Sequence, residues 1–371
     1  MKVLMIGPFP PPIHGMSIAN KILYEGLKKN NEVYFIDTNT EKNLGNLKKQ
    51  GKFSFLKISR SSYQISEGFF KIIFSKRFDV VYITPAQSPN GYIKYIPFMW
   101  AAKIRNTPYL IHIHGGYFRT MYDGVSGFRK KMIGNSLKNL SGAIVLGNSL
   151  RYMFEGLIPK EKIFVCENGV EDEIFATEEE VNKKIKKFGK DDTIRIVYLS
   201  NLMKTKGILD LLEAVRILKD KGKKVHLDVA GAIEPEIKDE VERFFEEMPD
   251  EVTYHGIVSG INKKKLLLDN YIFCLPTYYP NEGQPISILE AIACGCAIVT
   301  TDHSGIKDVA KKEFSIFVER ENPDSIAQGI EDVCKNFESI SLKAWKVANN
   351  NYSSDQFVNR VMEVLSRCSK R

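Results

Sequence analysis

The stretch at residues 194–230 reads "IRIVYLSNLMKTKGILDLLEAVRILKDKGKKVHLDVA". Its two ends are short and largely apolar runs, typical of strands that are buried on both faces of a sheet. The segment between them has apolar residues at helical spacing, and a glycine and lysines suit the C-terminus of that helix. The residues on its apolar face are Ile208, Leu211, Leu212, Val215 and Leu218. The stretch therefore predicts a strand–helix–strand unit of a parallel sheet.

The same alternation runs through the whole chain, in two cycles. Short β-rich runs recur at residues 2–6, 32–37, 79–84, 109–113, 142–146 and 162–166, and then at 194–200, 225–230, 252–256, 271–276, 297–301 and 315–318. Helical or polar segments separate these runs, so we predict an α/β fold with two doubly wound, Rossmann-like domains. Because ligands of such sheets bind at the carboxyl ends of the strands, we expect a shared substrate to lie in a cleft between the domains.

Composition agrees with a folded protein of two domains. The chain has 371 residues, which is long for one core, with 43% hydrophobic and 26% charged residues. No apolar run approaches the roughly 18 to 20 residues that span a bilayer. The six cysteines show neither a C-x-x-C pair nor the spacing of a zinc site. We therefore expect reduced core thiols and a cytoplasmic protein.

Charge is distributed unevenly along the chain. Residues 1–172 hold 24 Lys and Arg against 12 Asp and Glu, whereas the remainder holds 29 against 33. This asymmetry indicates that the first half faces an anionic partner, and a lysine-rich solvated surface is the alternative. Segment 52–79 combines aromatic and cationic residues and could lie on an anionic membrane leaflet, or it could be a helix covered by its own domain. No nucleic-acid recognition motif is present, so we expect no nucleic acid as partner.

The loop after the first strand argues against a dinucleotide. It reads "IGPFPPPIHGMSIANKIL" (6–23), and Asp37 ends the next strand, where a ribose-binding carboxylate would lie. However, the loop lacks G-x-G-x-x-G, and its four prolines offer no N–H to a phosphate. Gly15, just before a predicted helix, permits close approach to some other ligand, and a simple tight turn is the alternative.

Two histidines lie on one face of a predicted strand, in "YLIHIHGG" (109–116). A metal site would need a third ligand, and no cluster of ligands is evident, so we predict no metal. His112 is expected in the core. His114 falls at the carboxyl end of the strand and is expected to meet a ligand in the cleft.

Lys206 and two glutamates are placed to bind a ligand with anionic and hydroxyl groups. Lys206 stands at a predicted helix start, where a bound anion would draw on the lysine and on free N–H groups. In "NEGQPISILE" (281–290), Pro285 predicts a helix start, with Glu282 before it and Glu290 within it. Gly283 would let the backbone approach the ligand. Carboxylates accept sugar hydroxyls and helix starts suit phosphate, so the pattern favours a nucleotide sugar; two surface glutamates are the alternative.

These motifs together resemble a known family. The stretch "PTYYPNEGQPISILEAIACGCAIVTTDHSGIKDVA" (276–310) resembles the E-x7-E region of retaining glycosyltransferases of family 4, which have the two-domain GT-B fold. In the same order along the chain, further stretches resemble other motifs of the family: "PFPPPIHGMSIA" (8–19), "IHIHGG" (111–116), "ENGV" (167–170) and "NLMKTKG" (201–207).

The resemblance implies a role for each site residue. Glu282 would contact the hydroxyls of the donor sugar and Glu290 the ribose, while Lys206 would bind the diphosphate. The backbone from Gln284 through Pro285 and Ile286 to Ser287 would assist Lys206. His114 would line the reacting centre, and Gly15 would lie near donor phosphate or acceptor.

Three positions depart from the family pattern. Asn201 replaces an arginine of the phosphate site, which removes one cation worth about 1.5–3 kcal/mol. His14–Gly15 replaces a pair of glycines in the first loop. The glycine-rich turn near the donor is reduced to "AGAIEP" around Gly231.

The resemblance also implies the domain bounds and the reaction. An acceptor-binding domain would cover residues 1–167 with a C-terminal helix at about 354–371, and a donor-binding domain would cover 168–353. We expect transfer of a hexose-type sugar from a UDP-sugar to a glycan or lipid-linked glycan, with retention and without metal or other cofactor, for surface polysaccharide. The enzyme would be cytoplasmic or peripheral on the inner face of the membrane. A sugar-nucleotide epimerase and a non-catalytic nucleotide-sugar-binding subunit are the alternatives.

Overall fold

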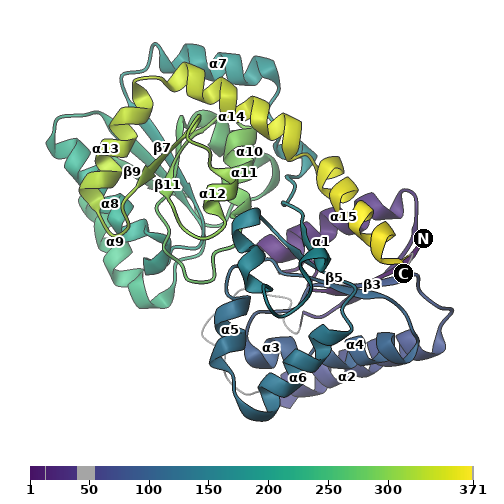
Figure 1. Cartoon of the computed structure of the whole chain (residues 1–371). Helices are drawn as coiled ribbons and strands as arrows, with labels where there is room; N and C mark the ends of the chain where they lie inside the picture. Colours follow the sequence, from purple (N-terminus) through teal and green to yellow (C-terminus); the bar gives the residue numbers. More distant parts are fainter. Residues whose placement is uncertain (13, 40–54, 370–371) are drawn as a thin grey trace. The chain divides into compact units, whose positions relative to one another are not determined.

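The computed structural model describes residues 1–12, 14–39 and 55–369. Contacts divide the chain into two compact units: unit 1 is Met1–Gly169 with Ser354–Arg371, and unit 2 is Val170–Ser353 (Figure 1). The sequence had suggested bounds at 167/168 and 353/354. Within the described ranges, no helix combines the length and the apolar character that crossing a membrane requires.

Unit 1 is built on a parallel sheet of six strands in the order β2-β1-β3-β4-β5-β6. The strands are β1 (Lys2–Gly7), β2 (Glu32–Asp37), β3 (Val80–Ile83), β4 (Tyr109–His112), β5 (Gly142–Val145) and β6 (Ile163–Val165). Each lies within a β-rich run of the sequence or extends it by one residue, which confirms the first predicted cycle.

Successive residues of these strands pack alternately into two separate hydrophobic cores, one on each face of the sheet. Val3 and Met5 face one side, together with apolar residues of α1 (Gly15–Lys28) and of α15 (Ser354–Ser369), so the end of the chain returns to unit 1 (Figure 1). Leu4 and Ile6 face the other side. That side is covered by α2 (Phe55–Phe74), α3 (Pro89–Ile93), α4 (Ile96–Ile104), α5 (Phe118–Gly124) and α6 (Gly127–Lys138). Period-two alternation places the strands between two helical layers.

Unit 2 repeats this architecture with the order β12-β11-β10-β7-β8-β9, again all parallel. The strands are β7 (Ile194–Leu199), β8 (Val225–Ala230), β9 (Val252–Tyr254), β10 (Ile272–Leu275), β11 (Ala297–Thr301) and β12 (Ser315–Val318). The helices are α7 (Glu178–Phe188), α8 (Ile208–Asp220), α9 (Lys238–Glu247), α10 (Gly260–Asp269), α11 (Ile286–Ala293), α12 (Ile306–Val309), α13 (Pro323–Cys334) and α14 (Phe337–Asn351). The order reverses between β7 and β10, and this switch point is where doubly wound sheets bind ligands.

Two helices of unit 2 begin and end as the sequence predicts. All five residues on the predicted apolar face of α8 are buried, and Gly222 follows the helix with a φ of 75°. Helix α11 begins directly after Pro285 and ends before Gly295, whose φ is 66°. Pro285 suits a helix start and a left-handed glycine suits a helix end, which explains both boundaries.

The cysteines are free thiols, and five of the six are buried. Buried cysteines behave as small apolar residues, as the sequence suggests. No group of three or more His, Cys, Asp or Glu side chains that could hold a metal ion occurs within the described ranges.

The aromatic and basic segment 52–79 contains the whole of α2, and its residues 52–54 lie outside the described part of the chain. One side of this helix is covered: a Cβ on Gly68 would lie 2.4 Å from the Phe98 ring of α4, and Ile72 is buried. Phe70 and Phe74 are exposed and stack on each other with 5.8 Å between ring centroids. The helix therefore has one packed side and one aromatic solvent-facing side.

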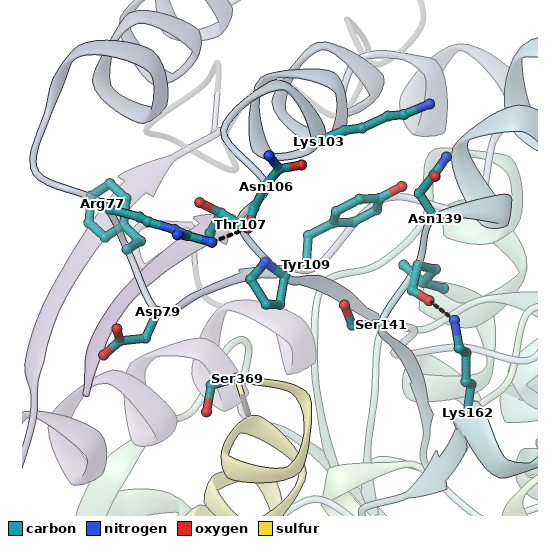
Figure 2. A pocket seen from close by; sticks show the side chains of 13 residues that line it. Arg77, Asp79, Lys103, Asn106, Thr107, Tyr109, Asn139, Ser141, Lys162 and Ser369 are labelled. Atoms are coloured by element: carbon teal, nitrogen blue, oxygen red, sulfur yellow. Dashed lines mark hydrogen bonds between the residues drawn. The ribbon is translucent and has the colours of Figure 1, made fainter. Parts of the chain in front are cut away.

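The amino-terminal edge of the unit 1 sheet carries a basic pocket (Figure 2). Arg77, Lys103 and Lys162 line it, and Asp79 is the acidic residue among its lining groups. Lys162 donates a hydrogen bond of 2.8 Å to the carbonyl of Leu140. The pocket is at the opposite edge from the carboxyl ends of the strands.

Candidate functional site

The turn after β7 and the loop after β10 pack closely against each other at the switch point of unit 2. Gly207 adopts a φ of 74°, and a Cβ on it would lie 2.4 Å from the carbonyl oxygen of Pro276. The Tyr278 amide donates to the carbonyl of Thr205 at 2.8 Å. Only glycine combines that backbone conformation with so close a contact. This close packing places the short helical turn Lys204–Lys206 beside the loop that carries Glu282.

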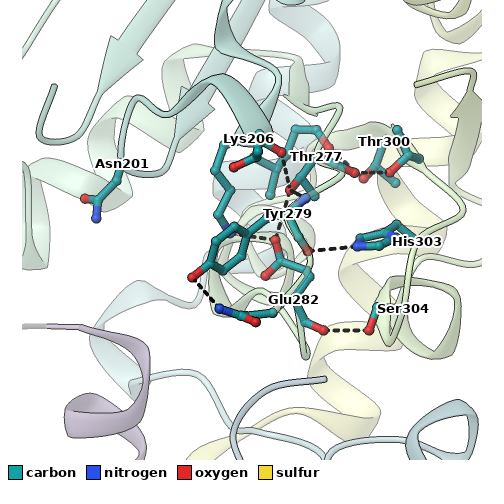
Figure 3. A network of polar contacts seen from close by, with 12 residues as sticks. Asn201, Lys206, Thr277, Tyr279, Glu282, Thr300, His303 and Ser304 are labelled. Carbon is teal, nitrogen blue, oxygen red and sulfur yellow. Dashed lines mark hydrogen bonds and ion pairs between the residues drawn. The ribbon is translucent and has the colours of Figure 1, made fainter. Parts of the chain in front are cut away.

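Lys206 and Glu282 form a partly buried ion pair between these two segments (Figure 3). The Lys206 Nζ lies 2.5 Å from the Glu282 Oε2, and the two side chains are 13% and 8% exposed. Thr277 Oγ1 donates to the same Oε2 at 3.1 Å, and the Lys206 ammonium lies 4.9 Å from the centre of the Tyr279 ring. The structure thus joins two predicted residues and adds Thr277 and Tyr279, which the sequence analysis missed.

The loop of Glu282 is also held from the end of β11. His303 Nε2 donates to the Tyr279 carbonyl at 2.8 Å, and Ser304 Oγ donates to the Glu282 carbonyl at 2.6 Å. Thr301 Oγ1 donates to the Thr277 carbonyl at 2.5 Å. These contacts fix the backbone on both sides of the carboxylate (Figure 3). The supporting residues lie within the 276–310 stretch, but the sequence predicted no role for them, because that role depends on β10 and β11 being neighbours.

The buried Glu290 is also paired with a lysine. Lys263, on α10, places its Nζ 2.7 Å from the Glu290 Oε1, and the two side chains are 13% and 5% exposed. Lys263 was not predicted as a site residue; it is one of three successive lysines in "NKKKLLLD". Each glutamate of the predicted motif is therefore neutralised by a lysine from another element.

The start of α11 offers a site for negative charge. No side chain caps this helix at its N-terminus, and its first turn has no acidic residue. Gly283, Gln284, Pro285 and Ile286 are buried, while Ser287 is half-buried. A helix N-terminus without an acidic or capping side chain retains partial positive charge that a phosphate can use.

Two predicted donor residues lie outside this network. The side chain of Asn201 is exposed and, in Figure 3, lies apart from the Lys206–Glu282 pair. Gly231 has a φ of 148°, and a Cβ there would lie 1.8 Å from the carbonyl oxygen of Ser200. The close approach of the β7 and β8 ends therefore requires Gly231, whatever ligand binds nearby.

In unit 1, His112 and His114 lie at the carboxyl end of β4, with 4.0 Å between their ring centroids and the ring planes tilted by 32°. His112 is in the core, as expected, and bonds to the Tyr82 hydroxyl at 2.7 Å. Neither ring nitrogen of His114 has a hydrogen-bond partner of good geometry in the described part of the chain. Burial lowers the pKa of His114 to about 3, and the polar side chain of Asn168 opposes this effect. His114 is thus a neutral ring with unused hydrogen-bonding capacity.

The first loop of unit 1 ends in a well-formed helix cap. Gly15 is the first residue of α1, His14 Nδ1 accepts from the Ser17 amide at 3.3 Å, and Ser17 Oγ accepts from the His14 amide at 3.0 Å. Asp37 accepts from the Phe9 amide at 3.1 Å. Asp37 therefore holds the proline-rich loop.

Part of the chain is similar in sequence to known glycosyltransferases. Residues 180–364 match the family model described as Glycosyl transferases group 1. The chain is similar to the amylovoran biosynthesis glycosyltransferase AmsK of Erwinia amylovora, with 29% identity over 161 residues, covering 42% of this chain and 38% of AmsK. It is similar to the capsular polysaccharide biosynthesis glycosyltransferase CapM of Staphylococcus aureus, with 28% identity over 225 residues and 57% of each chain covered. The chain thus spans about half the length of these curated relatives.

Among solved structures, the fold resembles that of Anabaena HepE in complex with UDP, with a TM-score of 0.73 and 14% identity over 99% of this chain and 100% of HepE. HepE has also been solved with UDP-glucose, where the TM-score is 0.71. At this identity the likeness concerns the fold, which is the expected GT-B arrangement of two Rossmann-like domains. Residues 180–364, which hold Lys206, Glu282 and Glu290, are accordingly a domain of the family Glycosyl transferases group 1.

Proposed function

We propose that the chain is a retaining glycosyltransferase of family 4 that moves a hexose-type sugar from a UDP-sugar to a glycan or lipid-linked glycan in surface polysaccharide biosynthesis. The observation that carries this proposal is the partly buried Lys206–Glu282 pair at the switch point of unit 2, next to the start of α11. The polysaccharide biosynthesis roles of AmsK and CapM support the pathway class, and the UDP and UDP-glucose complexes of HepE support the donor.

The anionic end of the donor would bind between Lys206 and α11. An ammonium group has three N–H donors, and in the structure one of them faces Glu282. The remaining donors and the backbone N–H groups of the first turn of α11 would face the diphosphate. When the glycosidic bond breaks, negative charge grows on this leaving group, and fixed donors stabilise it without reorganisation. We assign no step to a metal.

The hydroxyl-bearing parts of the donor would bind the two glutamates. Lys206 and Thr277 both contact the Oε2 of Glu282, which leaves its Oε1 to accept hydrogen bonds from the sugar. Lys263 contacts the Oε1 of Glu290, which leaves the Oε2 for the ribose. The ion pairs with the lysines hold both carboxylates in place, as a preorganised binding site requires.

Unit 1 would supply the acceptor side of the reaction. His114 is neutral, and its unused nitrogens could bind a hydroxyl of the transferred sugar or of the acceptor. In this proposal, the acceptor hydroxyl attacks the anomeric carbon from the same face that the diphosphate leaves, so the anomeric configuration is retained. The leaving phosphate takes the proton of the acceptor hydroxyl. Gly15 would lie near the donor phosphate or the acceptor.

Nucleotide release from a panel of UDP-, GDP- and ADP-sugars, with and without oligosaccharide or lipid-linked acceptors, tests this proposal. We expect acceptor-dependent release of UDP. An epimerase would convert the sugar and release no free diphosphate, and a non-catalytic subunit would bind UDP-sugar without turnover. Either result would replace the proposal with that alternative, and a protein that binds no nucleotide sugar would contradict all three.

A further inference from the structure

Unit 1 exposes large apolar side chains on two neighbouring helices, α4 and α6. Trp100 and Ile104, one turn apart on α4, are 47% and 66% exposed, and Phe128 on α6 is 75% exposed. Trp100 and Phe128 line the same pocket, so they belong to one surface. We call this surface the α4–α6 face and define it by Trp100, Lys103, Ile104, Phe128, Lys131 and Lys138. Exposed apolar groups gathered in this way mark an interaction site more often than single exposed residues do.

The α4–α6 face is also strongly basic. Neither helix contains an acidic residue, and between Asp79 and Glu155 the sequence has nine Lys and Arg against one acid, Asp123. That acid is paired with Arg119 at 2.7 Å. Unit 1 as a whole carries 28 Lys and Arg against 12 Asp and Glu. The positive charge of this face therefore has no internal counter-charge on its own helices.

Three lysines of the face are available to an external anion. Lys103, Lys131 and Lys138 line the pocket of Trp100 and Phe128, and none has a hydrogen bond or ion pair with another side chain in the described ranges. Lys103 also lines the basic pocket at the amino-terminal edge of the sheet, which Lys162 and Arg77 line from other sides (Figure 2). An apolar pocket thus adjoins a cationic one, and Lys103 stands between them.

We propose that the α4–α6 face docks on an anionic phospholipid bilayer. Trp100, Ile104 and Phe128 would enter the interfacial layer, where aromatic rings are favoured, and the three lysines would meet lipid phosphates. Exposed apolar side chains next to unpaired lysines fit an anionic bilayer, which offers both apolar chains and phosphates. A nucleic acid would leave the apolar side chains without a partner. The proposal concerns unit 1 alone and does not depend on sugar transfer in unit 2.

The two tryptophans of the chain allow a direct test with the full-length protein. Trp345 belongs to unit 2 and donates to the carbonyl of Ala176 at 2.8 Å. A Trp345→Phe protein therefore reports on Trp100 alone. With phosphatidylglycerol-containing vesicles we expect a blue shift of its emission and quenching by brominated lipid, and with pure phosphatidylcholine neither. Salt should weaken the binding, because exposed charges are screened.

Charge reversal gives the decisive comparison. Lys103→Glu/Lys131→Glu should weaken vesicle partitioning at least about tenfold, since each lysine near an anionic surface contributes on the order of 1 kcal/mol. Lys343→Glu/Lys346→Glu makes the same charge change on exposed lysines of α14 in unit 2 and should have little effect. Phe128→Ser should reduce the quenching at constant charge.

The proposal is wrong if wild type fails to bind anionic vesicles at low salt, or if both double variants lose binding equally. Binding to an RNA or DNA duplex without binding to vesicles would also overturn it. Thermal unfolding of each variant shows whether it is folded. UDP binding to the same samples, measured separately, reports on unit 2, so a failure of the proposed glycosyl transfer is distinguishable from a failure of membrane docking.

Discussion

The Lys206 ammonium lies 2.5 Å from the Glu282 carboxylate, although the two residues are 76 positions apart in the sequence. They come from the ends of β7 and β10, which are neighbours in the sheet only because the strand order reverses there. Neither charge could remain buried without the other, since an isolated buried charge is costly. The pair therefore stabilises the two loops against each other and sets the geometry that we propose for donor binding.

Removal of either member of this pair should reduce activity and stability together. We expect Lys206→Met and Glu282→Gln each to lower UDP release at least about tenfold, because each removes a proposed contact with the donor. Each should also lower the free energy of unfolding, by up to about 3–5 kcal/mol where a buried charge is left alone.

The double variant Lys206→Met/Glu282→Gln separates the two effects. It should recover much of the stability, measured by urea unfolding, and remain inactive. Lys204→Met, an exposed neighbour, serves as the control. Wild-type UDP release by Glu282→Gln would remove Glu282 from the proposed site.

Lys263 should matter for nucleotide binding. Lys263→Met leaves the Glu290 carboxylate buried without its partner, so we expect the affinity for UDP to fall at least about tenfold by calorimetry. Lys265→Met, at an exposed position of the same helix, should leave the affinity unchanged. If Lys263→Met bound UDP as tightly as wild type, Glu290 would not be a nucleotide ligand held by Lys263.

The glycines of unit 2 should differ in their tolerance of a side chain. Gly222 has a φ of 75°, and no atom lies within 4 Å of the position that a Cβ would take. Gly222→Ala should therefore lower the free energy of unfolding only by the strain of a left-handed backbone, about 1 kcal/mol. Gly207→Ala and Gly231→Ala should cost clearly more, because their Cβ atoms would lie 2.4 Å and 1.8 Å from carbonyl oxygens. Urea midpoints measure this order. Equal losses at the three positions would contradict the close approaches.

Acid should destabilise unit 1 through His114. Its pKa is about 3 in the folded state and 6.5 in the unfolded chain, so below pH 6.5 the unfolded chain takes up a proton that the folded state excludes. Stability is therefore full above pH 6.5 and is lost as the pH falls, by about 2 kcal/mol between pH 7 and pH 5. Burial also lowers the pKa values of the nearby His112 and His14, which act in the same direction.

Trp100 fluorescence in a Trp345→Phe protein reports on unit 1 during urea unfolding at pH 7, 6 and 5. His114→Asn should flatten the pH dependence, because asparagine does not titrate. An unchanged slope in His114→Asn would mean that other groups cause the acid sensitivity. In unit 2, His226 works in the opposite sense: the Asp228 carboxylate, 3.6 Å from its Nε2, raises the pKa of the imidazole. Its contribution is complete below the unfolded pKa and is lost as the pH rises through the folded pKa.

Much of the fold was predictable from local patterns. Strands buried on both faces are nearly continuous apolar runs, and the helix over Ile208–Asp220 shows its buried face in the spacing of its apolar residues. Lys206 and Glu282 were each predictable as site residues from their positions at strand ends and helix starts. Lys263 was not, because in a run of three lysines nothing local distinguishes the one that reaches Glu290.

The amino-acid sequence alone determined the strand–helix alternation, the start of α11 at Pro285 and the excess of positive charge in the first half of the chain. These depend on contacts and preferences within a few residues. Only the tertiary structure decided that Lys206 meets Glu282, that Lys263 meets Glu290 and that Trp100 shares a surface with Phe128. Those pairings depend on strand order and helix packing, which bring distant segments together through burial of their apolar faces.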